Sequence, residues 1–170
     1  MDYLKDQKKL HRKFVLMMIK KGCEVFEKEK TLHPINIQED NEITVCGDVH
    51  GQYYDLLNIF NLNGKPSEKN PYLFNGDFVD RGSFSVEVMI VLLAWKLALP
   101  TSFFLNRGNH EAKSLNKLYG FEAEVKHKYD QKVYDFFAQM FCYLPIASLI
   151  NKQVLVLHGG LFSKDDVTLA

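Results

Sequence analysis

Short apolar runs alternate with longer amphipathic stretches along most of this chain. Four of the runs are short and rich in Val, Ile, Leu, Phe or Tyr, which predicts short buried strands. These runs cover residues 43–46, 72–74, 103–105 and 154–157. Strands that alternate with helical segments are typical of an α/β fold.

Helices are predicted where apolar residues recur at the spacing of one helix face. The predicted helices cover residues 1 to about 30, 53–63, about 84–99, and 130–145. Ser83 is the expected cap of the third helix, and Asp130 is expected to begin the fourth. Residues 31–41 and 119–125 are expected to form irregular connections, because they lack a regular apolar pattern.

Each predicted strand runs into a cluster of Asp, Asn or His residues beside glycine. The clusters read GDVHG, NGDFVDRG, NRGNHE and HGG. Asp48, Asp77 and Asn109 follow one another at intervals of roughly 30 residues, about the length of one strand-helix-strand unit. Because such strand ends meet along one edge of an α/β sheet, we expect the clusters to form a single site.

The residue types in these clusters favour a metal site. The candidate metal ligands are Asp48, His50, Asp77, Asn109 and His158. Carboxylate, amide and imidazole ligands without thiolate suit Mn, Fe or Zn. A carboxylate with ligands on both sides, such as Asp77, can bridge two ions. Two ions about 3.5–4 Å apart can hold a hydroxide and clamp a phosphoryl group, which predicts hydrolysis of a phosphate ester.

Three neighbouring polar residues have candidate catalytic roles. His110 could protonate the leaving oxygen, and Asp80 could hold the other nitrogen of that imidazole. Arg81 could grip phosphate oxygens with its planar guanidinium. Each has a plainer interpretation, with Asp80 and Arg81 as a surface ion pair and His110 as a helix cap. Residues 64–67 are not a phosphate loop, because the upstream glycine of that motif is missing.

The composition indicates which kinds of partner and which cellular compartment to expect. Lys plus Arg and Asp plus Glu both total 21, so the net charge is zero. The overall charge therefore does not favour binding to nucleic acid or to a membrane surface. Cys23, Cys46 and Cys142 lie far apart in apolar surroundings and form no C-x-x-C pair, which indicates buried thiols in a reducing compartment. The expected location is the cytoplasm, with the nucleus as a second candidate. The apolar run 14–19 is too short for a signal peptide or a membrane span. The basic run 8–13 could bind an anionic partner, although a solvated helix face is the simpler interpretation.

In their order and spacing, GDVHG, GDFVDRG, RGNHE and HGG resemble the motifs of the phosphoprotein phosphatases, the metal-dependent serine/threonine phosphatases. The sequence between the motifs is similar to that of one branch of this family, whose members carry tetratricopeptide repeats ahead of the catalytic domain. The resemblance implies an α/β metallophosphoesterase fold with a central β-sandwich flanked by helices, truncated after its first half. Residues 1–40 would be a helical lead-in, and residues 41–170 the N-terminal half of a calcineurin-like catalytic domain.

The resemblance also implies a role for each candidate residue. The metal ligands would be Asp48 and His50 for the first ion, Asn109 and His158 for the second, and Asp77 between them. His110 would be the catalytic acid, Asp80 would orient it, and Arg81 would bind phosphate. The cofactors would be two metal ions, Mn, Fe or Zn, and the substrates proteins that carry phosphoserine or phosphothreonine.

Members of that family continue beyond this sequence, with one more His ligand and a second phosphate-binding Arg, so activity of the chain by itself is an open question. Chaperone partners bound through tetratricopeptide repeats are expected only if a longer product carries those repeats. Two other functions stay open. One is a small-molecule metallophosphoesterase, such as a dinucleoside polyphosphate hydrolase. The other is a non-catalytic half-domain that binds phosphoproteins or a regulatory partner.

Overall fold

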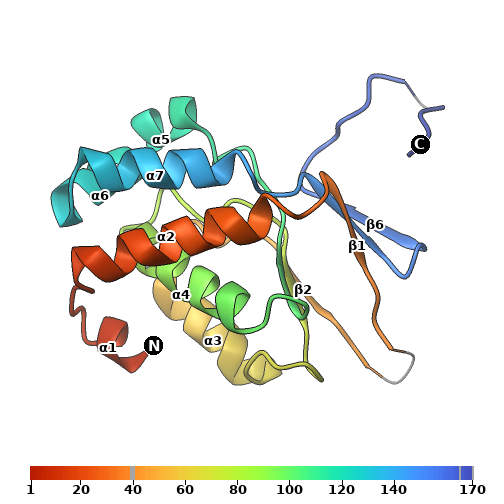
Figure 1. The fold of residues 1–170 in the computed structure, drawn as a ribbon, viewed down its shortest axis with the longest axis horizontal. Coiled ribbons are helices and arrows are strands. Elements are labelled where there is room, and N and C mark those ends of the chain that lie inside the picture. The colour runs from red at the N-terminus through yellow and green to blue at the C-terminus, as the bar shows by residue number, and fades with distance from the viewer. Residues whose placement is uncertain (39–40, 165, 170) are drawn as a thin grey trace.

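The computed structural model describes residues 1–38, 41–164 and 166–169. Figure 1 shows the helices gathered on one side of the molecule and strands β1 and β6 on the other. In chain order the elements are α1 (Asp2–Lys5), α2 (Arg12–Phe26), β1 (Leu32–Ile35), β2 (Thr44–Cys46), α3 (Tyr53–Asn63), β3 (Tyr72–Phe74), α4 (Ser85–Ala98), β4 (Phe103–Leu105), α5 (Lys113–Tyr119), α6 (Phe121–Lys128), α7 (Gln131–Phe141), β5 (Ala147–Ile150) and β6 (Val154–Leu157).

Two small sheets stack face to face. Strands β2, β3 and β4 form a parallel sheet, and β1, β5 and β6 form a mixed sheet in which β5 and β6 are antiparallel. Successive side chains of a strand point to opposite faces. Tyr72 and Phe74 of β3 therefore pack into the large helical core, whereas Leu73 packs with Ile35 and Ile150 of the second sheet. The parallel sheet thus lies between the helices and the mixed sheet.

Helix α4 lies at the centre of the helical layer. Its sequence is apolar on nearly every face, as expected for a helix with neighbours on several sides. It contacts α2, α3 and α6 as well as β4, and α2 also packs along α7 (Figure 1). The N-terminal segment is therefore part of the same core as a helix from the second half of the chain.

One ammonium group is buried in this core. Lys96, near the end of α4, is 0% exposed, and its Nζ donates to the Glu29 carboxylate and to the Pro100 carbonyl oxygen. The ammonium also lies over the rings of Phe26 and Phe104. Burial lowers the pKa of Lys96, and the Glu29 carboxylate acts in the opposite direction. The ion pair links the turn after α2 to the end of α4.

The structure confirms the four predicted strands and the helices expected over residues 53–63, 84–99 and 130–145, with small shifts at their ends. Asp130 is the N-cap of α7, where its carboxylate accepts the N–H of Val133 at 2.9 Å. The expectation for Ser83 is wrong, because Phe84 occupies the N-cap of α4 and the Glu124 carboxylate accepts the first N–H groups of that helix, those of Ser85 and Val86.

Other expectations about the elements are also wrong. Residues 1–30 form two helices, since Gln7 has a left-handed φ of 56° between them. Residues 31–41 contain β1, where Pro34 is tolerated because β1 lies at the edge of its sheet. Residues 39 and 40, beside the expected domain boundary, and residue 170 lie outside the described residues. Residues 119–125 are mostly helical, because Gly120 (φ 115°) ends α5 and α6 begins directly after it.

The three cysteines are free thiols, but they are not all buried. Cys46 is buried, Cys23 is half-buried, and Cys142 is exposed at the end of α7, which corrects the expectation for that residue. Burial raises the pKa of Cys46 to about 11. Among the described residues, no helix is long and apolar enough to cross a membrane.

Candidate functional site

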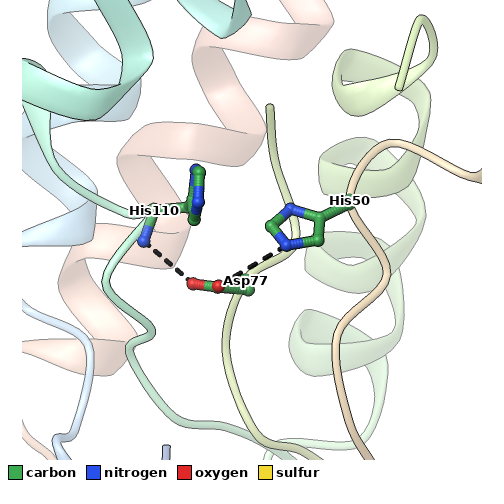
Figure 2. A group of neighbouring side chains, drawn as sticks. All are labelled: His50, Asp77 and His110. Atoms are coloured by element: carbon green, nitrogen blue, oxygen red, sulfur yellow. Dashed lines mark hydrogen bonds and ion pairs between the residues drawn. The ribbon is translucent and has the colours of Figure 1, made fainter. Parts of the chain in front are cut away.

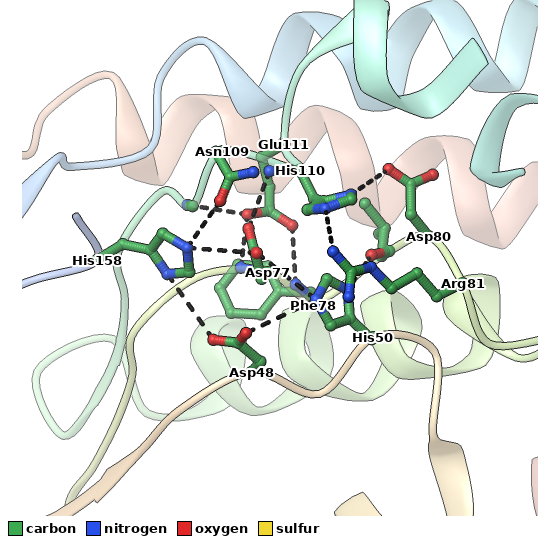
Figure 3. Close-up of polar contacts among 12 residues, drawn as sticks. Asp48, His50, Asp77, Phe78, Asp80, Arg81, Asn109, His110, Glu111 and His158 are labelled. Atoms are coloured by element: carbon green, nitrogen blue, oxygen red, sulfur yellow. Dashed lines mark hydrogen bonds and ion pairs between the residues drawn. The ribbon is translucent and has the colours of Figure 1, made fainter. Parts of the chain in front are cut away.

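The polar clusters meet where strands from both sheets end. Strands β2, β3 and β4 point their carboxyl ends at one place, and β6 of the second sheet ends beside them. Figure 3 shows that side chains from all four clusters lie around one centre. The sequence pattern predicts a site along the edge of one sheet, whereas the structure places it at the junction of two.

Asp77 lies at the centre of this site and is 3% exposed. Its Oδ1 accepts the backbone N–H of His110 at 2.8 Å. Its Oδ2 lies 3.6 Å from Nε2 of His50 and 3.2 Å from Nε2 of His158. Figure 2 shows His50 and His110 beside the carboxylate. One carboxylate oxygen is therefore shared between imidazoles that approach from two directions.

Hydrogen bonds fix which nitrogen of His50 faces the centre. Its Nδ1 lies 2.9 Å from the carbonyl oxygen of Val79, and this nitrogen donates because a carbonyl can only accept. Nε2 is then free to act as a ligand, 3.6 Å from Oδ2 of Asp48 and 3.6 Å from Oδ2 of Asp77. Asp48 is exposed, so this part of the site is open to solvent.

His158 faces the centre from the opposite side. Its Nδ1 donates to the backbone oxygen of Asn75 at 2.7 Å. Nε2 then points at two oxygens, Oδ1 of Asn109 at 2.9 Å and Oδ2 of Asp77 at 3.2 Å. A nitrogen lone pair that faces two oxygens is unfavourable unless a proton or a cation lies among them. Ligand atoms around one ion with bonds of about 2.1 Å would be roughly 3.0–3.4 Å apart, so this donor set fits a metal ion.

His110 forms a buried pair with Asp80. The imidazole is 2% exposed, and its Nδ1 donates to Oδ2 of Asp80 at 2.8 Å. Asp80 is 0% exposed and also accepts from the Asn116 side chain at 3.1 Å and from the N–H of Phe121 at 2.9 Å. The other ring nitrogen, Nε2, accepts from Nη2 of the exposed Arg81 at 3.3 Å.

These contacts exclude the plainer interpretations of the same residues. Asp80 is buried and faces His110, so it does not form a surface ion pair with Arg81. His110 is not a helix cap either, because Ala112 occupies the N-cap of α5.

Two groups of side chains among the described residues have ligand atoms within 4.8 Å of one another. They are His50, Asp77 and His110, and Asp48, Asp77 and His158. Asp77 belongs to both groups, as the sequence pattern predicts for a bridging carboxylate. Both ring nitrogens of His110 have protein partners, Asp80 at Nδ1 and Arg81 at Nε2. The contacts of His110 therefore favour a role other than metal binding.

Glu111 is a part of the site to which the sequence pattern assigns no role. It is 0% exposed, and its carboxylate accepts the N–H groups of Asp77, Phe78 and Gly108, each at 2.8 Å. Burial raises the pKa of Glu111 to about 7, while the three amide groups act in the opposite direction. The side chain ties the loop after β3 to the loop after β4. In the sequence, the signal that could identify Glu111 as a site residue is its position next to His110 in RGNHE.

The backbone of the site is strained where the polar side chains are held. His50, Asp77, Asp80 and Arg81 have left-handed φ values of 43°, 55°, 71° and 66°. Such conformations cost a non-glycine residue about 1–3 kcal/mol and concentrate at functional sites. The surrounding hydrogen bonds, including those to Glu111, offset that cost.

Residues 42–170 match the family model of the calcineurin-like phosphoesterases. The chain therefore belongs to this family of phosphoesterases, whose members depend on divalent metal ions.

Individual proteins of known name resemble this chain more closely than the family model alone indicates. The chain is 57% identical to human "Serine/threonine-protein phosphatase 5" over 169 residues, which cover 99% of this chain and 34% of that protein. It is 55% identical to the Arabidopsis thaliana protein of the same name, covering 100% of this chain and 32% of that one. The chain thus spans about a third of the length of these curated relatives.

A solved protein serine/threonine phosphatase from Saccharomyces cerevisiae, described as similar to human phosphatase PP5, has the same fold. It superposes with a TM-score of 0.96 at 48% identity, over 99% of this chain and 54% of that one.

Proposed function

We propose that this site hydrolyses phosphoserine and phosphothreonine in proteins. The observation that carries the proposal is the Asp77 carboxylate, shared between His50 and His158, with the buried pair of His110 and Asp80 beside it. The similarity to proteins named serine/threonine-protein phosphatase 5 supports the substrate class.

The donor set suits two metal ions, for which we propose Mn, Fe or Zn. Asp48 and His50 would hold one ion, Asn109 and His158 the other, and Asp77 would contact both. Ions of this kind lower the pKa of a water molecule and polarise phosphoryl oxygens. The hydrogen bonds to Val79 and Asn75 keep Nε2 of each histidine turned toward the shared carboxylate.

His110 would supply the proton that the leaving group needs. The serine or threonine oxygen leaves poorly as an alkoxide, so protonation by a general acid speeds the reaction by about 10²–10⁴. The Nδ1 proton of His110 is engaged by Asp80, which leaves Nε2 as the nitrogen that can carry a second proton and donate it. The buried Asp80 carboxylate holds the ring in this orientation, with Nε2 directed away from Asp80.

Arg81 would bind the phosphoryl group next to the acid. Its guanidinium is exposed, so it can reach a substrate, and Nη2 already lies 3.3 Å from Nε2 of His110. The planar fork can place two donors on phosphate oxygens. The guanidinium also lies over the ring of Tyr119, with Cζ 5.8 Å from the ring centroid, which limits its freedom.

The proposed partners are phosphoserine and phosphothreonine proteins in the cytoplasm or nucleus. Three free thiols support a reducing compartment. Chaperone partners bound through tetratricopeptide repeats belong to the proposal only for a longer product.

Phosphate release from three substrates tests the function. We expect the chain with Mn²⁺ to hydrolyse a phosphothreonine peptide, and to lose this activity with a chelator and regain it with added Mn²⁺. Faster hydrolysis of diadenosine tetraphosphate would instead indicate a small-molecule metallophosphoesterase, and a preference for a phosphotyrosine peptide would contradict the substrate class. Binding of the phosphopeptide without any turnover would indicate a non-catalytic binding domain.

A further inference from the structure

A buried hydrogen-bond network joins the two sheets directly behind His158. Its side chains are Asn75 at the end of β3, Asn106 at the end of β4, and Ser148 in β5. The network also binds the last two carbonyl groups of β6, those of Val156 and Leu157. It therefore connects the ends of four strands at the level of the site.

Asn106 is the centre of this network. Its Nδ2 donates to Oδ1 of Asn75 at 2.9 Å and to the carbonyl oxygen of Val156 at 3.2 Å. Its Oδ1 accepts from Oγ of Ser148 at 2.7 Å. Asn106 is 0% exposed and Ser148 is 1% exposed. Both amide protons and the amide oxygen thus have partners, as a buried amide requires.

The network reaches His158 through Asn75. The Nδ2 of Asn75 donates at 3.1 Å to the carbonyl oxygen of Leu157, the residue before His158. The backbone oxygen of Asn75 accepts Nδ1–H of the His158 ring at 2.7 Å. Asn75 therefore holds both the backbone and the ring of this histidine, and Asn106 holds the side chain of Asn75.

The surroundings of Asn106 show that adhesion between the sheets does not require an amide. The two sheets pack through apolar side chains, among them Leu73, Phe104 and Ile150. A leucine at position 106 would add to such a contact, whereas a buried amide gains little net stability from its hydrogen bonds. What the amide adds is direction, because its three hydrogen bonds fix β5 and β6 relative to β3 and β4.

We propose that Asn106 is a positioning residue for His158. Through Asn75 and the end of β6, it keeps Nδ1 of His158 donating to Asn75 and Nε2 turned toward Asp77 and Asn109. The consequence for metal affinity rests on the proposed function, in which His158 holds one of two ions. Removing such an outer partner of a metal ligand lowers metal affinity by about 10–100-fold.

The test is a double variant, Asn106→Leu with Ser148→Ala, in the 170-residue chain. Changing both partners avoids a buried Ser148 hydroxyl left without its acceptor, while Oδ1 of Asn75 and the carbonyl oxygen of Val156 lose the Asn106 donor, which is the intended change. Asn61→Leu, at an exposed position of α3, is the matched control. If the double variant does not fold, Ser148→Ala alone removes only the outermost hydrogen bond of the network. We expect this single variant to show smaller changes of the same kind in the His158 ring and in Mn²⁺ affinity.

Two measurements read the result. Imidazole ¹⁵N NMR of the metal-free chain at pH 8 should show Nδ1 of His158 fully protonated in the wild type and control, whether or not Nε2 also carries a proton, and only partly protonated in the variant. Titration calorimetry with Mn²⁺ should show one of two ions bound about 10–100-fold more weakly by the variant.

A variant in which Nδ1 of His158 remains fully protonated would overturn the positioning role, whatever its metal affinity. If the wild type binds fewer than two Mn²⁺ ions, the proposed two-metal function fails. The tautomer spectra of the metal-free chain would still decide the role of Asn106.

Discussion

Gly108 and Glu111 fix the Asp77 carboxylate and its backbone from two sides. Glu111 accepts the N–H of Asp77 at 2.8 Å. Gly108 packs so closely that an added Cβ would overlap both the nitrogen and Oδ1 of Asp77. The glycine in RGNHE is therefore required for close approach to the shared carboxylate, and Asp77 cannot move away without losing the hydrogen bond to Glu111.

Gly108→Ala should displace Asp77, since the new methyl group overlaps Asp77 atoms in a fully packed region. We expect a loss of about 1–3 kcal/mol in the free energy of unfolding, the usual cost of overpacking, together with weaker Mn²⁺ binding. Gly47→Ala is the control, because a Cβ there meets nothing within 4 Å. Urea unfolding and Mn²⁺ titration of both variants give the comparison, and equal effects would contradict the packing argument.

The thiols should differ in reactivity because their surroundings differ. Cys46 is 8% exposed and burial raises its pKa to about 11, so about a thousandth of it is thiolate at pH 8. Cys142 is exposed. We expect iodoacetamide at pH 8 to alkylate Cys142 first and Cys46 only after unfolding in urea, as followed by mass spectrometry of peptides. Native-state labelling of Cys46 at the rate of Cys142 would show that β2 is not packed as described.

At the level of elements, the sequence predicts those whose apolar pattern is strong. The helices with a clear apolar stripe and the four runs before the polar clusters are present. Strand β1 contains Pro34 and β5 has the mixed sequence ASLI, so neither has a strand pattern. They form strands through pairing, because β5 lies between β1 and β6 and pairs with both. The sequence pattern does not predict α6, because Gly120 indicates a break, whereas in the structure this one glycine separates two consecutive helices.

The ion pair between Lys96 and Glu29 joins two of these elements and should matter for stability. Glu29→Ala leaves the fully buried ammonium of Lys96 without its carboxylate, which costs about 3–5 kcal/mol in unfolding free energy. Glu122→Ala removes an i,i+4 pair with Lys126, whose side chain is 47% exposed, and should cost less than about 1 kcal/mol. Chemical denaturation measures both, and similar small losses would mean that Lys96 finds water or another partner.

At the level of the whole molecule, the site depends on how two sheets meet. The clusters that follow the strands identify the polar residues, because strand ends of an α/β sheet converge. The pattern does not show that β6 belongs to a different sheet from β2, β3 and β4. The junction depends on long-range contacts of single residues, such as Asn106 with Val156 and Asn75 with Leu157. The apolar periodicity of a single segment cannot predict such contacts, because it depends only on neighbouring residues in the sequence.

The measurement that tests the central claim most directly is hydrolysis of a phosphothreonine peptide with saturating Mn²⁺, by the wild type and by His110→Asn. The variant keeps the proposed metal ligands but removes the proton donor. We expect its kcat to fall by about 10²–10⁴, while the number of Mn²⁺ ions bound per chain stays at two. Equal rates for the two proteins, or no Mn²⁺-dependent hydrolysis by the wild type, would contradict the account.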